Sequence, residues 1–513
     1  MALASTHTAT VEGVAAHMVT VEANVGPGLP GMHIVGLGDA AVKESRDRIR
    51  TALANTAMPW PRTKIMVSLS PAHLPKAGSH FDLPIALTVV GSLDPRAQER
   101  LQRTMFMGEL ALDGALRRVE GILPMLLRSH VPGGCDAPDT VVVPRANAAE
   151  AALLGRGDIL VADTLPEVWR WVVGEGGLDP APAARASTPA GGAPDFADIA
   201  GQLFERDAME IAAAGGHHVM MVGPPGSGKS MLAERLPGIL PEMSVAEQIE
   251  TTALHSAAGI SRGHIVAHRP FIAPHPSLTR VELIGGGSGV PQPGAVSQAH
   301  NGVLFLDEAS EIAAGVLDSL RIPLETGRVV LRRSRREVIY PAHFQLVLAA
   351  NPCPCGSPGE RCSCQPAQRA RHLANISGPL RDRMDIFIPT TAQSAVVSPR
   401  GSESSAEIAQ RVAGARDRAQ RRWARAGVEA TVNARVSSTV LRRDFPPDEE
   451  TVITLQRLLK DGALTQRGVD KVLKLAWTVA DLAGEDQPRI DHLDRALALR
   501  ASHMVGAGAG VAA

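Results

Sequence analysis

The chain has 513 residues, of which 44% are hydrophobic, 20% charged and 3% aromatic, and its formal net charge is −1. This length predicts roughly two to four domains, because one hydrophobic core rarely serves so long a chain. The near-neutral charge excludes a uniformly basic coat, so any surface for nucleic acid must be a local patch. Neither a signal-peptide pattern nor an apolar run long enough to span a bilayer is present, and we expect a cytoplasmic protein without membrane contact.

Two low-complexity stretches divide the chain into three modules. Residues 1–178 mix short β-type runs with amphipathic helical ones, which predicts an α/β fold. After a Pro/Ala/Gly-rich linker at 179–194, residues 195–390 alternate apolar runs with helical stretches, a pattern typical of a parallel sheet flanked by helices. A polar linker at 391–405 follows, and residues 406–505 keep a helical periodicity that predicts an all-α module.

The strongest motif is GPPGSGKS, which follows the apolar run HHVMMV and precedes a helical stretch. This is a G-x-x-x-x-G-K-[ST] phosphate-binding loop in the strand–loop–helix context that it requires. Its backbone N–H groups and the helix start supply positive potential, Lys229 reaches the outer phosphates and Ser230 binds Mg²⁺. The alternative is a chance Gly-rich turn, which the context disfavours. We expect ATP contacts from Gly223, Pro224, Pro225, Gly226, Ser227, Gly228, Lys229, Ser230 and Met231.

Polar residues follow two further apolar runs, GVLFL and FQLVLAA. Asp307 and Glu308 end the first, where a carboxylate pair is costly unless it has a function. We assign Asp307 to the Mg²⁺ shell and Glu308 to orienting the attacking water. Asn351 ends the second run and could position that water or contact the γ-phosphate. The alternatives are a solvent-facing charge pair and an Asn that caps a turn before Pro352.

Two arginine groups have a candidate role. Arg381 and Arg383 flank Asp382 in ISGPLRDRMDIFI, and an arginine here could act as a finger supplied to a neighbouring subunit, or the stretch could be a surface helix end with ion pairs. The stretch 326–344 predicts a strand–turn–strand hairpin whose tip is strongly basic, suited to a phosphate backbone without sequence readout. The alternative is a solvated basic turn. The candidate DNA contacts are Arg332, Arg333, Arg335 and Arg336.

Four of the five cysteines lie in one loop, NPCPCGSPGERCSC, as two C-x-C pairs. Clustered cysteines in the cytosol are thiols or metal ligands more often than disulfides. Cys353, Cys355, Cys362 and Cys364 are enough soft ligands to close a tetrahedral Zn²⁺ site, although the spacing is not the common C-x2-C. Free thiols without metal are the alternative, and the sequence leaves both open.

Together these motifs carry a resemblance. GPPGSGKS, GVLFLDE, NPCPCG and SGPLRDRMDI, in this order, look like the magnesium-chelatase-like AAA+ ATPases of the YifB/ComM competence type. The phrases GLPGMHIVGLGDAAVKESRDRIRTAL, LPKAGSHFDLPIAL and RPFIAPHPSLTRVELIGGGSGVPQPGAVSQAHNGVLFLDE resemble the same family. The resemblance covers nearly the whole chain and implies a central AAA+ P-loop core with a C-terminal α-helical lid.

The resemblance also implies functions for individual residues. It implies a hexameric ring with ATP and Mg²⁺ at the subunit seams, where Arg383 acts on the neighbour's nucleotide. Arg467, in LTQRGVDKVL, looks like a contact to the γ-phosphate of its own chain, and Gln202 would lie near the adenine. The implied activity is DNA branch migration in recombination and natural transformation. The alternatives are chelatase-type remodelling of a protein partner and a scaffold that does not hydrolyse ATP.

The N-terminal module resembles the Lon protease catalytic fold, which uses a Ser–Lys dyad. The resemblance puts His80 near the serine position and Leu123 near the lysine position, so both reactive groups are missing. We therefore expect a module without proteolytic activity, serving assembly or DNA contact.

Overall fold

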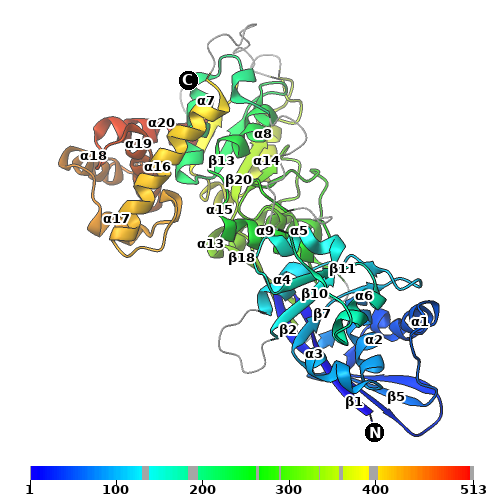
Figure 1. Cartoon of the computed structure of the whole chain (residues 1–513). Coiled ribbons are helices and arrows are strands. Elements are labelled where there is room, and N and C mark those ends of the chain that lie inside the picture. Colours follow the sequence, from blue (N-terminus) through cyan, green and yellow to red (C-terminus); the bar gives the residue numbers. More distant parts are fainter. Residues whose placement is uncertain are drawn as a thin grey trace.

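The computed structural model shows three modules, of which the first two are each built on one large sheet (Figure 1). The N-terminal module lies at one end of the central module, and the C-terminal helices project from another side of the central module (Figure 1). No helix in the described part of the chain is both long enough and apolar enough to cross a membrane. The structure describes residues 2–129, 138–182, 194–260, 265–287, 291–333, 336–357, 362–391 and 403–508.

The N-terminal module is built on an eight-stranded mixed sheet in the order β12-β11-β10-β7-β1-β2-β5-β3. The long antiparallel pair β1–β2 forms its centre. The strands are β1 Ala2–Glu12, β2 Ala15–Gly26, β3 Gly31–Val35, β5 Lys64–Ser70, β7 Thr104–Phe106, β10 Thr140–Pro144, β11 Ile159–Ala162 and β12 Asp179–Pro180, with the short pairs β4 Leu37–Gly38 and β6 Pro75–Lys76, and β8 Glu109–Leu110 and β9 Leu116–Arg117. The helices are α1 Ala40–Asn55, α2 Asp82–Gly91, α3 Gln98–Gln102, α4 Ile122–Arg128, α5 Ala148–Ala152 and α6 Leu165–Val172.

The end of this module differs from the sequence prediction at one point. Residues 179–180, placed at the start of the first linker, form β12 and pair with β11 at the edge of the sheet. The rest of that linker lies largely outside the described residues. Within the module His80 is buried, with Nε2 2.8 Å from the carbonyl oxygen of Ala9, and Leu123 is fully buried in α4. These are core positions, and the absence of proteolysis remains a prediction.

The alternating apolar runs predicted a parallel sheet, and the central module contains one with five strands. Its order is β14-β17-β20-β13-β21, and every neighbouring pair is parallel. The strands are β13 Val219–Val222, β14 Phe271–Ile272, β17 Val303–Leu306, β20 Gln345–Ala350 and β21 Ile386–Pro389. The helices are α7 Leu203–Gly215, α8 Lys229–Ile239, α9 Val245–Ala257, α10 Arg280–Ile284, α11 Ala295–Gln298, α12 Ala314–Asp318, α13 Arg321–Thr326, α14 Pro366–Ala374 and α15 Gly378–Arg381.

Apolar side chains on both faces of the sheet explain why these strands are buried inside the central module. Along β13 and β17 alternate residues enter two different cores, one on each side of the sheet. A strand buried on both faces must be apolar throughout, so it lacks the in–out alternation of a surface strand. Two small antiparallel pairs flank the sheet: β15 Gly285–Gly286 with β16 Gln292–Pro293, and β18 Arg328–Arg333 with β19 Arg336–Pro341.

The C-terminal module is helical and shares one core with the central sheet. Its long first helix begins at a capping box, in which the Ser404 hydroxyl accepts from the N–H of Glu407 and the Glu407 carboxylate accepts from Ser404. Ser405 joins the modules, because its hydroxyl accepts from the N–H of Phe196 at 2.8 Å. The helices are α16 Ser405–Arg425, α17 Ser438–Asp444, α18 Glu449–Lys460, α19 Gln466–Ala483 and α20 Ile490–Gly508.

The N-terminal module also contacts the core directly. Helix α4 packs against α9, and the hydroxyl of Ser256 accepts from the N–H of Gly121 at 3.0 Å. The turn between β1 and β2 meets the base of the β18–β19 hairpin, where a Cβ on Gly13 would lie 2.6 Å from Val338 Cγ1. The N-terminal module therefore touches the element that carries the basic tip.

Candidate nucleotide-binding site

The phosphate-binding loop joins the carboxyl end of β13 to the start of α8. Local backbone geometry explains why two positions of the loop are glycine. A Cβ on Gly223 would lie 2.0 Å from Thr390 Oγ1, and Gly228 has a φ of +84° in the left-handed region that favours glycine. The loop thus passes closely between β21 and α7 before the helix begins. Residues 223–228 of the sequence motif form the loop, and its last two residues, Lys229 and Ser230, begin α8.

Lys229 is buried, and its ammonium is held inside the loop. It donates to the carbonyls of Gly223 at 2.7 Å and Pro224 at 2.9 Å, and to Asn351 Oδ1 at 3.2 Å. Burial lowers the pKa of Lys229, whereas the charges of Asp307 and Glu308 oppose that fall. The amide of Asn351, which follows β20, and the ammonium of Lys229, which begins α8, therefore meet at one edge of the sheet.

Ser230 and Asp307 contact each other at the same edge of the sheet. The Ser230 hydroxyl donates to Asp307 Oδ2 at 2.9 Å. A hydroxyl and a carboxylate at this distance are two oxygen ligands of the kind that Mg²⁺ prefers. The residues present therefore fit a magnesium nucleotide, with Lys229 beside them for the phosphates.

Glu308 is exposed and has an unusual backbone. Its φ is +47°, which is uncommon for a residue other than glycine, and its N–H donates to Asp307 Oδ1 at 2.8 Å. Strain of this kind persists when the surroundings fix it, and it clusters at functional sites.

Gln202 and Met231 lie at the margin of the loop. The side-chain amide of Gln202 donates to the carbonyl of Ser227 at 2.8 Å, and Gln202 has a φ of +50°. Met231 is 43% exposed in the first turn of α8. The structure therefore brings Gln202 to the phosphate loop, and its contact with adenine remains a prediction.

Two residues that contact this site, Thr390 and His372, were not predicted from the sequence. The hydroxyls of Ser227 and Thr390 are 2.7 Å apart, and His372 Nε2 is 3.2 Å from the carbonyl oxygen of Asn351. Thr390 follows the apolar run IFIP as Asp307 follows VLFL, so the same strand-end signal could have found it. His372 lies on α14, and no pattern in the sequence connects it to Asn351.

Arg383 and Arg467 lie at the opposite edge of the sheet. Arg383 precedes β21, and Asp385 beside it donates its N–H to the carbonyl of His218, just before β13 begins. Strand β13 has four residues and so spans roughly 13 Å. The guanidinium of Arg383 pairs with Glu325 and donates to Pro379 O at 2.7 Å. It does not reach the phosphate loop of its own chain.

The resemblance implied that Arg467 contacts the γ-phosphate within the same chain, and this stays a prediction. In this structure Arg467 pairs with Asp382 at the amino edge. The reason is the packing of α19. One turn after Arg467, Lys471 donates to Asp385 Oδ1 at 2.5 Å and holds the helix start at that edge. Both arginines line one cleft, away from their own phosphate loop.

The predicted basic hairpin is present as β18–β19, with Arg332 opposite Glu337 in the register. Arg332 is exposed and forms an ion pair with Glu337, with Nε 2.5 Å from Oε2. One of the four expected positive charges is therefore partly neutralised. The backbones of Arg333 and Arg336 pair with each other, and Arg335 lies outside the described residues. Contact of these arginines with DNA remains a prediction.

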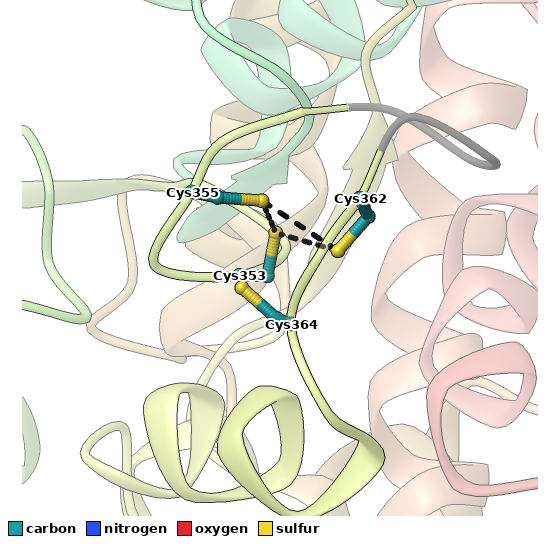
Figure 2. Close-up of side chains that lie close together, drawn as sticks. All are labelled: Cys353, Cys355, Cys362 and Cys364. Carbon is teal, nitrogen blue, oxygen red and sulfur yellow. Dashed lines mark hydrogen bonds between the residues drawn. The ribbon is translucent and has the colours of Figure 1, made fainter.

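The four clustered cysteines converge beside the nucleotide edge (Figure 2). Their loop begins directly after Asn351, and it rests on the phosphate loop. A Cβ on Gly356 would lie 2.8 Å from Pro225 Cγ.

A parallel sheet with a phosphate loop and an acidic strand end at its carboxyl edge defines a P-loop nucleotide-binding protein. Three family models match the chain. The model "Magnesium chelatase, subunit ChlI" matches residues 195–397, and "Subunit ChlI of Mg-chelatase" matches residues 21–147. The model "Magnesium chelatase, subunit ChlI C-terminal" matches residues 402–500. Relatives align over 98% of the chain. They include a Mycobacterium tuberculosis protein (44% identical, 99% of its length), Escherichia coli YifB (38%, 97%) and the Haemophilus influenzae competence protein ComM (38%, 98%).

The chain belongs to the YifB/ComM family of magnesium-chelatase-like proteins. The resemblance seen in the sequence motifs is thereby confirmed. Membership of this family indicates an AAA+ ATPase that uses ATP and Mg²⁺.

Proposed function

We propose that the chain hydrolyses Mg-ATP and uses the energy to remodel branched DNA as a ring of six copies. The observation that carries the proposal is the arrangement of Lys229, Ser230 and Asp307 at the carboxyl edge. The lysine is buried against the loop carbonyls, and the hydroxyl–carboxylate pair lies beside it at 2.9 Å. A bound Mg²⁺ would neutralise charge on the phosphate oxygens. Glu308 would orient the attacking water, and Asn351 would help to position it.

The position of the two arginines supports the proposed ring. Because Arg383 and Arg467 lie at the amino edge, neither is placed to stabilise charge on the phosphates of its own chain. A second copy whose phosphate loop faced this edge would receive both guanidiniums. An arginine finger supplied in trans accelerates hydrolysis by several orders of magnitude. We therefore assign Arg383 and Arg467 together to the neighbour's site, which replaces the assignment of Arg467 within one chain.

DNA is the proposed substrate for two reasons. The β18–β19 hairpin carries arginines at its tip, and six such tips around a ring would form a positive track for phosphates. One relative is named a competence protein. The family resemblance implies heteroduplex extension by branch migration, so branched DNA is the form to test.

Remodelling of a protein partner is the second candidate function. The three family models that match the chain are named for magnesium chelatase. The Arg332–Glu337 pair also makes the hairpin less basic than its arginine count suggests. A chelatase-like motor would need no DNA for full turnover.

Steady-state phosphate release separates these functions. The full-length protein is assayed alone, with linear duplex and with a synthetic four-way junction, beside Lys229→Ala. We expect turnover that depends on Lys229 and rises several-fold with the junction. Turnover that Lys229→Ala leaves unchanged contradicts the assigned ATP site. Turnover that depends on Lys229 but ignores DNA favours the protein-remodelling function.

A further inference from the structure

Four cysteine sulfurs lie close together in the loop that follows β20 (Figure 2). Cys353 Sγ lies 3.3 Å from Cys355 Sγ and 3.4 Å from Cys362 Sγ, and the last two sulfurs are 3.6 Å apart. Including Cys364, all four ligand atoms lie within 4.8 Å of one another. In a tetrahedral zinc–thiolate site with Zn–S bonds of about 2.3 Å, neighbouring sulfurs are about 3.8 Å apart.

The contacts between the thiols do not account for this convergence. An S–H group is a weak donor, so three sulfur–sulfur hydrogen bonds contribute little. Cys353 is buried, but Cys355 is exposed and the other two are half-buried, so a shared hydrophobic core does not hold them together. The loop is rich in Pro and Gly and has no helix or strand between its first and last cysteine among the described residues. A multivalent ligand would supply the missing cohesion.

The ligand set selects the kind of ion. Four soft sulfurs exclude Mg²⁺ and Ca²⁺, which prefer oxygen ligands. Tetrahedral four-sulfur sites hold zinc or iron–sulfur clusters. A cluster needs its cysteines spread around several iron and sulfide atoms, whereas these sulfurs approach one centre. Disulfides would join them in pairs at about 2.05 Å, and the observed separations are longer.

We propose that Cys353, Cys355, Cys362 and Cys364 bind one Zn²⁺ ion in a closed structural site that fixes this loop against the phosphate loop. Four protein ligands leave no open position, so the ion is structural rather than catalytic. The loop starts at Asn351, which bonds Lys229 at 3.2 Å. Near Gly356 it touches Pro225 of the phosphate loop. Zinc binding itself does not depend on ATP hydrolysis or on DNA.

Metal content of the purified full chain tests the proposal directly. Zinc is measured by mass spectrometry after purification without chelators and after reconstitution with Zn²⁺ in reducing buffer. We expect about one zinc per chain, as in other four-thiolate sites. Cobalt substituted for zinc should give the absorption of tetrahedral thiolate coordination. A content below about a tenth of an equivalent after reconstitution would overturn the site.

Matched variants locate the ion. Cys355→Ser/Cys364→Ser should lose the zinc, whereas Cys135→Ser, which changes the one cysteine outside the cluster, should retain it. If the double variant does not fold, Cys364→His keeps the test open, because histidine is also a zinc ligand and should preserve binding. Equal zinc in the double variant and in Cys135→Ser would place the metal elsewhere and contradict the proposal. With the site lost, KM for ATP should rise several-fold relative to Cys135→Ser.

Discussion

At the residue scale, the residues proposed to bind the nucleotide differ in their surroundings from the residue proposed to act in hydrolysis. Lys229 and the Ser230–Asp307 pair are held by hydrogen bonds within the protein, whereas the Glu308 side chain is exposed. A side chain that contacts only the attacking water contributes to the transition state and little to ground-state affinity. The two kinds of residue should therefore give different kinetic phenotypes.

Glu308→Gln should strongly slow ATP turnover and preserve nucleotide binding. The amide keeps the size of the side chain but removes the carboxylate that polarises water, so we expect kcat to fall roughly a hundredfold or more. The Kd for ATP should stay within about threefold, because Lys229 and Asp307 are untouched. Phosphate release and fluorescent-nucleotide titration measure the two quantities. Normal turnover in Glu308→Gln would remove the assigned role.

Local motifs made most of this edge predictable. The phosphate loop is read from eight consecutive residues, and Asp307 and Asn351 each follow an apolar run whose strand ends at the same edge. Arg467 could not be placed in this way, because its position depends on how α19 packs across the sheet. The Lys471–Asp385 contact that fixes this packing joins residues 86 positions apart.

At the element scale, the β18–β19 hairpin combines a buried base with a charged tip. Val329, Val338 and Tyr340 are buried in the core, and the Tyr340 hydroxyl donates to the carbonyl of Pro291 at 2.6 Å. The alternating pattern of 326–344 made the hairpin predictable. The Arg332–Glu337 pair was not anticipated, because it depends on the strand register.

Changes to that pair should move DNA affinity in opposite directions. Arg332→Ala removes a phosphate contact and should weaken binding a few-fold, lowering the slope of log K against log salt by about 1. Glu337→Gln releases Arg332 and removes a negative charge, so it should tighten binding. Arg421→Ala, exposed on α16, is the control. Fluorescence anisotropy across a salt series measures the effect, and equal affinities in all three variants would argue against the hairpin as the DNA contact.

The arrangement of the modules was less predictable than their fold classes. The α/β classes and the helical C-terminal part followed from periodicity. The shared core between α16, α19 and the parallel sheet could not be read from the sequence, because the stretch before α16 resembles a loose linker. Contacts such as Ser405 with Phe196 link positions 209 residues apart.

At the scale of the whole molecule, the proposed assembly requires that each site draw on two copies. Lys229→Ala removes a chain's own site but leaves its Arg383, and Arg383→Ala does the reverse. Mixed rings should therefore contain seams that join an intact phosphate loop to an intact arginine. We expect ATPase activity in the mixture to exceed the sum of the separate variants after subunit exchange. Activity equal to that sum would contradict a finger supplied in trans.

The most direct measurement follows branch movement in a synthetic four-way junction by fluorescence energy transfer while the full-length protein turns over ATP. The account predicts strand separation that needs ATP and Mg²⁺, and that disappears in Glu308→Gln although this variant still binds the junction. Movement at the same rate in Glu308→Gln, or an unmoved junction beside rapid ATP hydrolysis by the unaltered chain, would contradict it.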